Sequence, residues 1–282
     1  MSQLETNEIL QEWRQSAPYW EKHSATIRLM FAPLTAALIE EAGITAGQAV
    51  LDVAGGPGEP SLTIAEHVGP AGTVTCTDAV AEMVAAAENE AHRRGLTNVR
   101  FRQCAADSLP FEESAFDAAV SRLGVMFFPD PLAGLREMLR VTKPGGAVAL
   151  LVWHKNELNP FTRIITDVVS RYVETPVADP DAPGAFRFAE PGKLAGILRQ
   201  AGAVDVQDRV LHFKIEAPIS ALDFWTLRSE TSDTLRAKLA KLPADKVERV
   251  RQEVLAAAHD YFPNKQMSFP AQAVIVAGKK PK

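Results

Sequence analysis

A glycine-rich turn and a carboxylate stand at the spacing of a nucleotide-binding site. Residues 50–58 read as a short apolar strand that runs into the turn Gly55-Gly56-Pro57-Gly58. Twenty residues later a second expected strand ends on Asp78. Glycines let a ligand approach the main chain, and a carboxylate at the next strand tip can accept both hydrogen bonds of a ribose diol. The pattern predicts a pocket for an adenosine-bearing cofactor; a tight turn and a helix cap are the alternatives.

The same turn departs from the dinucleotide pattern G-x-G-x-x-G. Ser61 stands where the third glycine would allow close packing of helix on strand. Glu59 occupies the helix entrance, where a pyrophosphate would need free N–H groups and no competing anion. A nicotinamide-dependent oxidoreductase also needs a Tyr/Lys or His/Asp set, which is not apparent. These features weigh against that alternative class of enzyme.

A third segment follows the third expected strand. Small residues at 104–106 precede Asp107 and Ser108. Small side chains suit the flat face of adenine, and the Asp107 carboxylate can accept a hydrogen bond from its exocyclic amine. The alternative is a capped loop in solvent.

Strand and helix alternate from residue 48 onward. Alternating βα units imply a parallel sheet with right-handed crossovers. We expect strands at 49–54, 73–77, 98–103, 116–121 and 147–153, and helices at about 61–68, 80–94 and 132–141.

The flanking segments have a different character. Before the first strand we expect helical pieces at 8–13 and 24–42, joined by an aromatic elbow at 17–20. After residue 160 we expect helices at 160–174, 192–201 and 220–261, a loop at 178–191, and strands at 204–215 and 273–277. The resulting division is a helical lid at 1–45, a cofactor-binding domain at 46–215 with 270–282, and a helical insert at 216–269.

As an ordered set, these motifs resemble class I S-adenosylmethionine-dependent methyltransferases. The likeness is to the type 11 group and to ubiquinone/menaquinone C-methyltransferases, and it covers about residues 48–154. It is carried by Asp52–Gly58, Asp78, Ala106-Asp107, Phe116-Asp117, Phe128-Pro129-Asp130-Pro131 and the run 135–146. The resemblance implies an α/β fold: a seven-stranded Rossmann-like sheet with helices on both faces, whose last strand is an antiparallel hairpin partner.

The resemblance also implies roles for single residues. Asp52 and the main chain of Gly55, Gly56 and Gly58 would hold the methionine end of S-adenosylmethionine. Asp78 would bind the ribose, while Ala79 and Met83 would flank the adenine. Further cofactor contacts are expected from Ala106, Asp107, Ser108, Ser121 and Arg122, the last two near the sulfonium, with Tyr19 and Trp20 folding over the cofactor as a lid. Pro57 stiffens the turn, and we expect binding to survive.

Methyl transfer from a sulfonium is a direct displacement, in which the protein aligns the reactants and excludes water. His154, just past the fifth strand, is the best candidate for a general base, with His23 second; a structural histidine is the alternative. An acceptor pocket could be lined by Phe161, Phe186, Phe188, Phe224, Trp225 and Arg228, although each also suits a core. A hydroxyl or an enol-like carbon is the favoured acceptor atom.

Composition narrows the class of partner. The 282-residue chain has a formal net charge of −5, and Ser121-Arg122-Leu123-Gly124 lacks the Asn/Asp-Pro-Pro-aromatic signature of nucleic acid methylation. Both features argue against a nucleic acid substrate. Two cysteines indicate a reducing cytoplasm and make no metal site. No membrane span is expected. The insert could form a homodimer surface, and a binding protein that has lost transfer is the remaining alternative.

Overall fold

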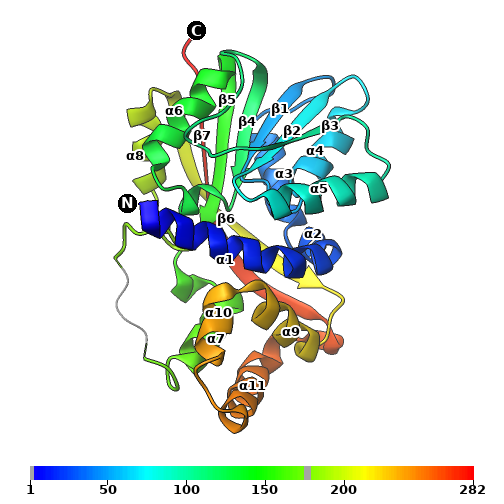
Figure 1. Ribbon diagram of the computed structural model, residues 1–282, viewed down its shortest axis with the longest axis vertical. Helices are drawn as coiled ribbons and strands as arrows, with labels where there is room; N and C mark the ends of the chain where they lie inside the picture. Colours follow the sequence, from blue (N-terminus) through cyan, green and yellow to red (C-terminus); the bar gives the residue numbers. More distant parts are fainter. Residues whose placement is uncertain (1–2, 175–178) are drawn as a thin grey trace.

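The computed structural model describes residues 3–174 and 179–282. Seven strands form one sheet in the order β3-β2-β1-β4-β5-β7-β6, and helices cover both of its faces (Figure 1). Strand β7 runs antiparallel to both of its neighbours, while the other pairs are parallel. The predicted α/β class, with its antiparallel last strand, is confirmed.

The strands at the centre of the sheet are buried on both faces because helices cover both sides. Their sequences are accordingly near-continuous apolar runs, as in Ala147–Trp153, whereas edge strand β3 carries exposed arginines. The strands are β1 (Ala49–Val53), β2 (Thr73–Asp78), β3 (Val99–Gln103), β4 (Phe116–Arg122), β5 (Thr142–Trp153), β6 (Val204–Ala217) and β7 (Met267–Lys279).

Five helices pack on this sheet, and local signals fix their ends. The Asp130 side chain accepts the Ala133 N–H at 3.0 Å and Pro131 opens the following helix, a common start for a helix. The five are α3 (Ala32–Glu41), α4 (Ser61–Val68), α5 (Ala81–Arg93), α6 (Pro131–Val141) and α8 (Lys193–Ala201). Four short 3₁₀ turns lie at Val125–Phe127, Asn156–Leu158, His259–Tyr261 and Pro263–Lys265.

The N-terminal segment differs from the expected helical pieces. Helix α1 runs unbroken over Gln3–Lys22, with Pro18 inside it, so the predicted aromatic elbow is wrong. An interior proline costs a helix about 3 kcal/mol, and the contacts of α1 with α5 and with the helices below it offset that cost. Helix α2 (Ser24–Met30) then ends at Phe31, which divides the expected 24–42 helix in two.

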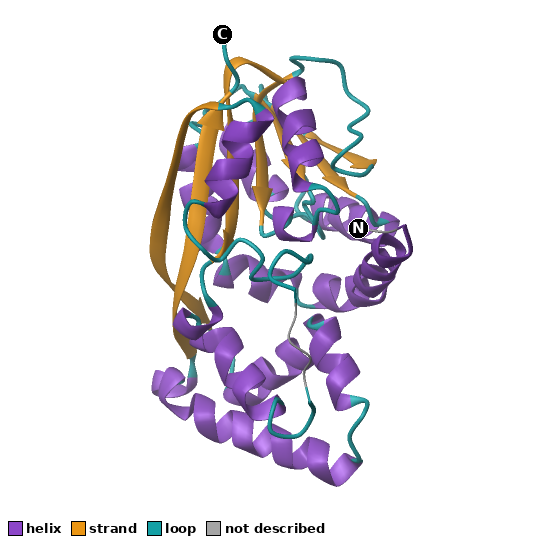
Figure 2. Cartoon of the chain, turned by 90° about the vertical axis from the view of Figure 1, so that its left-hand side faces the viewer, coloured by secondary structure: helices purple, strands orange, loops and turns teal. Residues whose placement is uncertain are grey.

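Strands β6 and β7 are longer than expected, and together they extend beyond the ends of the other five strands (Figure 2). Residues 267–272, which alternate between buried and partly or fully exposed, also belong to β7, although the strand was expected only at 273–277. At the far end of this hairpin Ala217 pairs with Met267. The hairpin carries four helices that we call the cap: α7 (Pro160–Val169), α9 (Ala221–Thr231), α10 (Asp233–Leu239) and α11 (Ala244–Ala258).

An aromatic cluster lies in the cap and continues the hydrophobic core of the sheet. Phe269 of β7 lies with its ring centroid 4.6–5.8 Å from four other rings. These belong to Phe161, Phe224, Tyr261 and Phe262.

Among the described residues, no helix is both long enough and apolar enough to cross a membrane.

Candidate cofactor site

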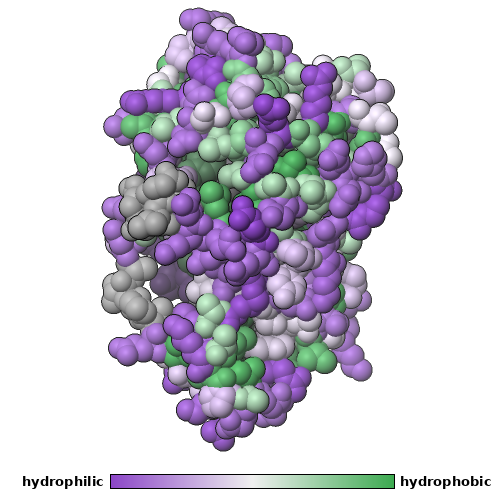
Figure 3. All heavy atoms as spheres, viewed as in Figure 1, coloured by the Kyte–Doolittle hydropathy of each residue, from purple (hydrophilic) through white to green (hydrophobic). Residues whose placement is uncertain are grey.

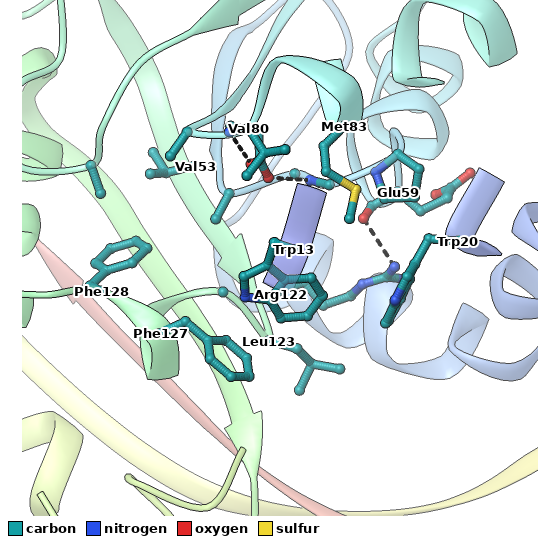
Figure 4. Close-up of a pocket in the computed structure, with 18 of the residues that line it drawn as sticks. Trp13, Trp20, Val53, Glu59, Val80, Met83, Arg122, Leu123, Phe127 and Phe128 are labelled. Atoms are coloured by element: carbon teal, nitrogen blue, oxygen red, sulfur yellow. Dashed lines mark hydrogen bonds between the residues drawn. The ribbon is translucent and has the colours of Figure 1, made fainter. Parts of the chain in front are cut away.

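A cavity of about 200 Å³ lies where the tips of β1, β2 and β4 meet helices α1 and α2 (Figure 4). The sheet side supplies the glycine turn and the loops that follow β2, β3 and β4. The helical side supplies mostly apolar residues, among them Trp13, Trp20, Ile27 and Phe31. In Figure 3 the outer surface along α1 is mostly hydrophilic, so this helix turns its apolar side inward.

The glycine turn presents bare main chain to the cavity. Gly56 and Gly58 have φ values of 54° and 114°, which favour glycine. A Cβ on Gly55 would lie 2.7 Å from both the Asp52 Oδ2 atom and the Cys76 Sγ atom. A Cβ on Gly58 would lie 2.9 Å from Leu62, so the turn has no room for a side chain at Gly55 or Gly58, whereas at Gly56 only the positive φ favours glycine.

Asp52 is fully buried below the turn and does not line the cavity. Its Oδ2 atom accepts hydrogen bonds from the hydroxyl of Ser61 at 2.6 Å and from the Ser61 N–H at 3.1 Å. Burial raises the pKa of Asp52 to about 7, although the bonds from Ser61 and the charge of Arg122 oppose this shift. Asp52 thus supports the turn and the start of α4. Ser61, at the position of a third glycine, donates both of these hydrogen bonds to the carboxylate.

Asp78 lies half-buried at the tip of β2 and lines the cavity. One carboxylate oxygen accepts the Gly56 N–H at 3.0 Å and the other accepts the Val80 N–H at 2.9 Å. Burial raises the pKa of Asp78 to about 6 against the effect of these bonds. A carboxylate oxygen can accept more than one hydrogen bond, so Asp78 can hold the turn and still accept from a ligand.

The expected adenine region is only partly brought together. Ala79, Met83 and Ala106 line the cavity, and so do Val80 and Cys104–Ala105. The predicted pair Asp107 and Ser108 is exposed and lies outside the lining. The chain turns there, with the Ser108 N–H bonded to the Ala105 carbonyl, which directs both side chains to solvent.

The two residues predicted at the tip of β4 point in different directions. Successive strand residues face opposite sides of a sheet. Ser121 is fully buried outside the cavity lining, beside Gly124, whereas Arg122 lines the cavity. The Arg122 guanidinium donates to the Thr35 hydroxyl at 2.7 Å and to the Glu59 carbonyl at 3.0 Å.

The lid prediction singled out Tyr19 and Trp20, of which only Trp20 lines the cavity. Its indole N–H donates to the Thr231 carbonyl of α9 at 3.0 Å. Tyr19 instead lies under the Arg236 guanidinium. The sequence reading missed Trp13, which stands edge-on to Phe127 at a centroid distance of 5.1 Å. The 3-4-3 spacing of Leu10, Trp13, Ala17 and Trp20 would have revealed this stripe.

Neither histidine proposed as a base reaches the cavity. The ring nitrogen Nδ1 of buried His154 lies 2.7 Å from the Ala189 carbonyl, and the Nε2 of His23 lies 2.6 Å from the Glu230 carboxylate. The candidate acceptor residues also lie outside the lining, which does not include Phe161, Phe186, Phe188, Phe224, Trp225 or Arg228. Phe161 and Phe224 belong instead to the aromatic cluster of the cap.

Comparison with known proteins decides the family. The profile of the ubiE/COQ5 methyltransferase family matches residues 34–173. A ubiquinone/menaquinone biosynthesis C-methyltransferase UbiE of Serratia proteamaculans is 30% identical over 194 residues, which cover 65% of this chain and 76% of that protein. The chain belongs to the ubiE/COQ5 methyltransferase family.

Other matches are more partial. An uncharacterized protein of Mycobacterium tuberculosis, Rv1405c, is 39% identical over 124 residues, which cover 44% of each chain. The chain thus spans less than half the length of the mycobacterial relatives that it matches. The crystal structure of YcgJ from Bacillus subtilis has a TM-score of 0.57 and 22% identity, and covers 88% of this chain and 98% of that one. This likeness shows that the two proteins share a fold.

Proposed function

We propose that this protein is an S-adenosylmethionine-dependent methyltransferase that acts on a small organic acceptor. The observation that carries the proposal is the junction of β1 and β2, where Asp78 accepts the Gly56 N–H at one wall of the cavity. Membership of the ubiE/COQ5 methyltransferase family supports it.

The residues present fit this cofactor. A turn built from Gly55, Gly56 and Gly58 leaves main-chain N–H and C=O groups for a polar tail. Asp78 offers carboxylate oxygens to a ribose, and Val80, Met83 and Ala106 supply an apolar slot for a purine. When bound, the cofactor supplies an electrophilic methyl group on a sulfonium.

The remaining wall would receive the acceptor. Ile27, Phe31, Leu123 and Phe127 make it apolar and aromatic, and we propose residues 1–45 as a lid that covers it. Such a wall excludes water and orients the acceptor, which is how a protein accelerates direct displacement. Because no histidine among the described residues lines the cavity, proton removal by His154 is not part of this proposal.

The proposal predicts that S-adenosylhomocysteine binds and that NAD does not. Calorimetric titration and thermal shift measure both, since a ligand that binds only the native state raises the melting temperature. Stabilisation by NAD alone would favour an oxidoreductase and would contradict the proposal.

We further expect Asp78→Ala to weaken S-adenosylhomocysteine binding by about 10-fold or more, because hydrogen bonds between a carboxylate and a ribose diol are lost. Asp107→Ala is the matched control: this carboxylate is exposed outside the cavity, and its loss should leave the affinity within about twofold. Equal effects of the two changes would refute the role of Asp78.

A further inference from the structure

Arg122 is a buried cation on the wall of the cavity. The residue is 9% exposed, and one of the dashed lines in Figure 4 joins its guanidinium to the main-chain oxygen of Glu59. The other hydrogen bond goes to the hydroxyl of Thr35. Both acceptors are neutral, and the Nε atom is buried without a partner. At least one donor of this guanidinium is therefore unused.

The charge of Arg122 also lacks a dedicated counter-ion. Among the described residues no carboxylate oxygen lies within 4.0 Å of its guanidinium. Asp52 and Glu59 act on it only from farther away. The Glu59 carboxylate is already paired with Arg94 and bonded to Thr63, and burial favours the neutral form of Asp52. A buried guanidinium is costly unless an anion compensates it.

Arg163 and Arg228 also have a buried Nε atom without a partner, but neither lines the cavity, whereas other arginines are paired with carboxylates. Arg94 pairs with Glu59 and Glu66, and Arg140 pairs with Glu137. Arg28, the other arginine that lines the cavity, is exposed and can be hydrated. Arg122 combines burial, a free donor and contact with the cavity.

The order of the strands gives the missing anion its place. Strand β1 lies between β2 and β4, so the glycine turn lies between Asp78 at the tip of β2 and Arg122 at the tip of β4. A cofactor whose ribose sits on Asp78 would cross the turn and direct its other end toward Arg122. That end of S-adenosylmethionine carries a carboxylate, the group that a guanidinium binds best.

We propose that Arg122 binds the carboxylate of the cofactor's methionine tail. This assignment rests on the proposed function and changes the expected place of Arg122, because a guanidinium beside the sulfonium would repel it. A carboxylate on the acceptor is the other source of the same chemistry.

The test separates the tail from the nucleoside. S-adenosylhomocysteine carries the carboxylate, whereas 5′-methylthioadenosine lacks the amino-acid tail. We expect Arg122→Gln to weaken S-adenosylhomocysteine roughly 10- to 100-fold in calorimetric titrations and to change 5′-methylthioadenosine less than twofold. Arg122→Lys should recover part of the loss, and Thr35→Val, which keeps the charge but frees the guanidinium, should lose less than Arg122→Gln. Retained binding of 5′-methylthioadenosine shows that each variant is folded.

Three results would overturn the assignment. One is an equal loss of both ligands in Arg122→Gln, which means that Arg122 acts through the turn. Another is a tail-specific loss in Arg28→Gln with none in Arg122→Gln, which assigns the carboxylate to the exposed arginine. The third is unchanged S-adenosylhomocysteine affinity in Arg122→Gln together with loss of benzoate binding to the S-adenosylhomocysteine complex, which assigns the carboxylate to the acceptor. Wild-type protein that binds neither nucleoside overturns the proposed function itself.

Discussion

At the scale of single residues, Asp52 shows how the fold supports the glycine turn with a carboxylate that is itself fully buried. Its carboxylate lies under the glycine turn and receives two hydrogen bonds from Ser61. Desolvation raises the pKa of Asp52 more than those hydrogen bonds lower it, so the pKa is about 7. The folded protein therefore holds a proton on Asp52 in a pH range where the unfolded chain has released it.

This shift predicts the pH dependence of stability. Between about pH 4 and pH 7 the unfolded chain binds fewer protons at Asp52 than the folded protein, so this group lowers the free energy of unfolding as pH rises. Asp52→Asn removes the titration and keeps a partner for the Ser61 hydroxyl. We expect the free energy of unfolding of the variant, relative to wild type, to be higher at pH 8 than at pH 5 by on the order of 2 kcal/mol in urea titrations.

Asp117→Asn is the control of opposite sign. Lys143 and the Ala49 N–H hold the pKa of Asp117 below its usual value despite some desolvation. Its stabilisation is present at neutral pH and is lost on acidification, so this variant should lose more at pH 7 than at pH 3. A pH-independent difference for Asp52→Asn would contradict the account of its burial.

Sequence spacing predicts some of these residues well and others badly. The glycines and Asp78 follow from strand tips in a fixed order, which periodicity reveals. The exposure of Asp107 follows from a turn at 105–108 that no hydrophobic pattern marks. That Arg122 has only neutral hydrogen-bond acceptors could not be predicted, because these acceptors belong to Thr35 and Glu59, which are distant in sequence and meet Arg122 only in the folded chain.

At the scale of elements, helix α1 is bound to the cap by groups near its C-terminal end. Trp20 donates to Thr231, Lys22 pairs with Glu230 at 2.7 Å, and Arg236 donates to the Ser16 hydroxyl at 2.6 Å. The sequence indicated helix on both sides of Pro18, but only tertiary packing explains why one helix runs through it. These contacts hold the proposed lid over the cavity.

Weakening this attachment should let a bound ligand leave faster. Glu230→Gln replaces the ion-pair partner of Lys22, which is also the hydrogen-bond partner of His23, by a neutral amide, and a partly exposed ion pair contributes about 0.2–1 kcal/mol. We expect the dissociation rate of S-adenosylhomocysteine to rise roughly two- to fivefold in stopped-flow displacement. Glu113→Gln, which alters a distant ion pair with Lys280, should leave the dissociation rate unchanged. An equal rise of the rate in both variants would show that the effect does not depend on the lid.

At the scale of the whole molecule, the sheet and the cap are joined through the hairpin of β6 and β7. Alternation of strand and helix predicts the sheet, because each βα unit carries its own period. The extension of β7 through Pro270 was not predicted, and a proline, which lacks a backbone donor, is uncommon inside a strand. Its place opposite Lys214 on an edge pair tolerates that loss.

The aromatic cluster of the cap predicts a divided response to mutation. Phe269→Ala removes the ring around which the other four gather and should cost about 3–5 kcal/mol. We expect hydrogen–deuterium exchange to accelerate in α9 and α11 while β1 and β4 stay protected. Uniform acceleration over both regions would show instead that cap and sheet open together.

The pairing of Ala217 with Met267 has a consequence for how such a protein can change. The chain leaves the paired strands and returns to them at neighbouring positions, so residues 218–266 form one continuous excursion from the hairpin. A change of length within this segment leaves both junctions in register, provided that Phe224, Tyr261 and Phe262 keep their contacts with Phe269. None of residues 218–266 lines the cavity, so a change in this segment would act on a bound ligand only through helix α1, which Thr231, Glu230 and Arg236 hold in place.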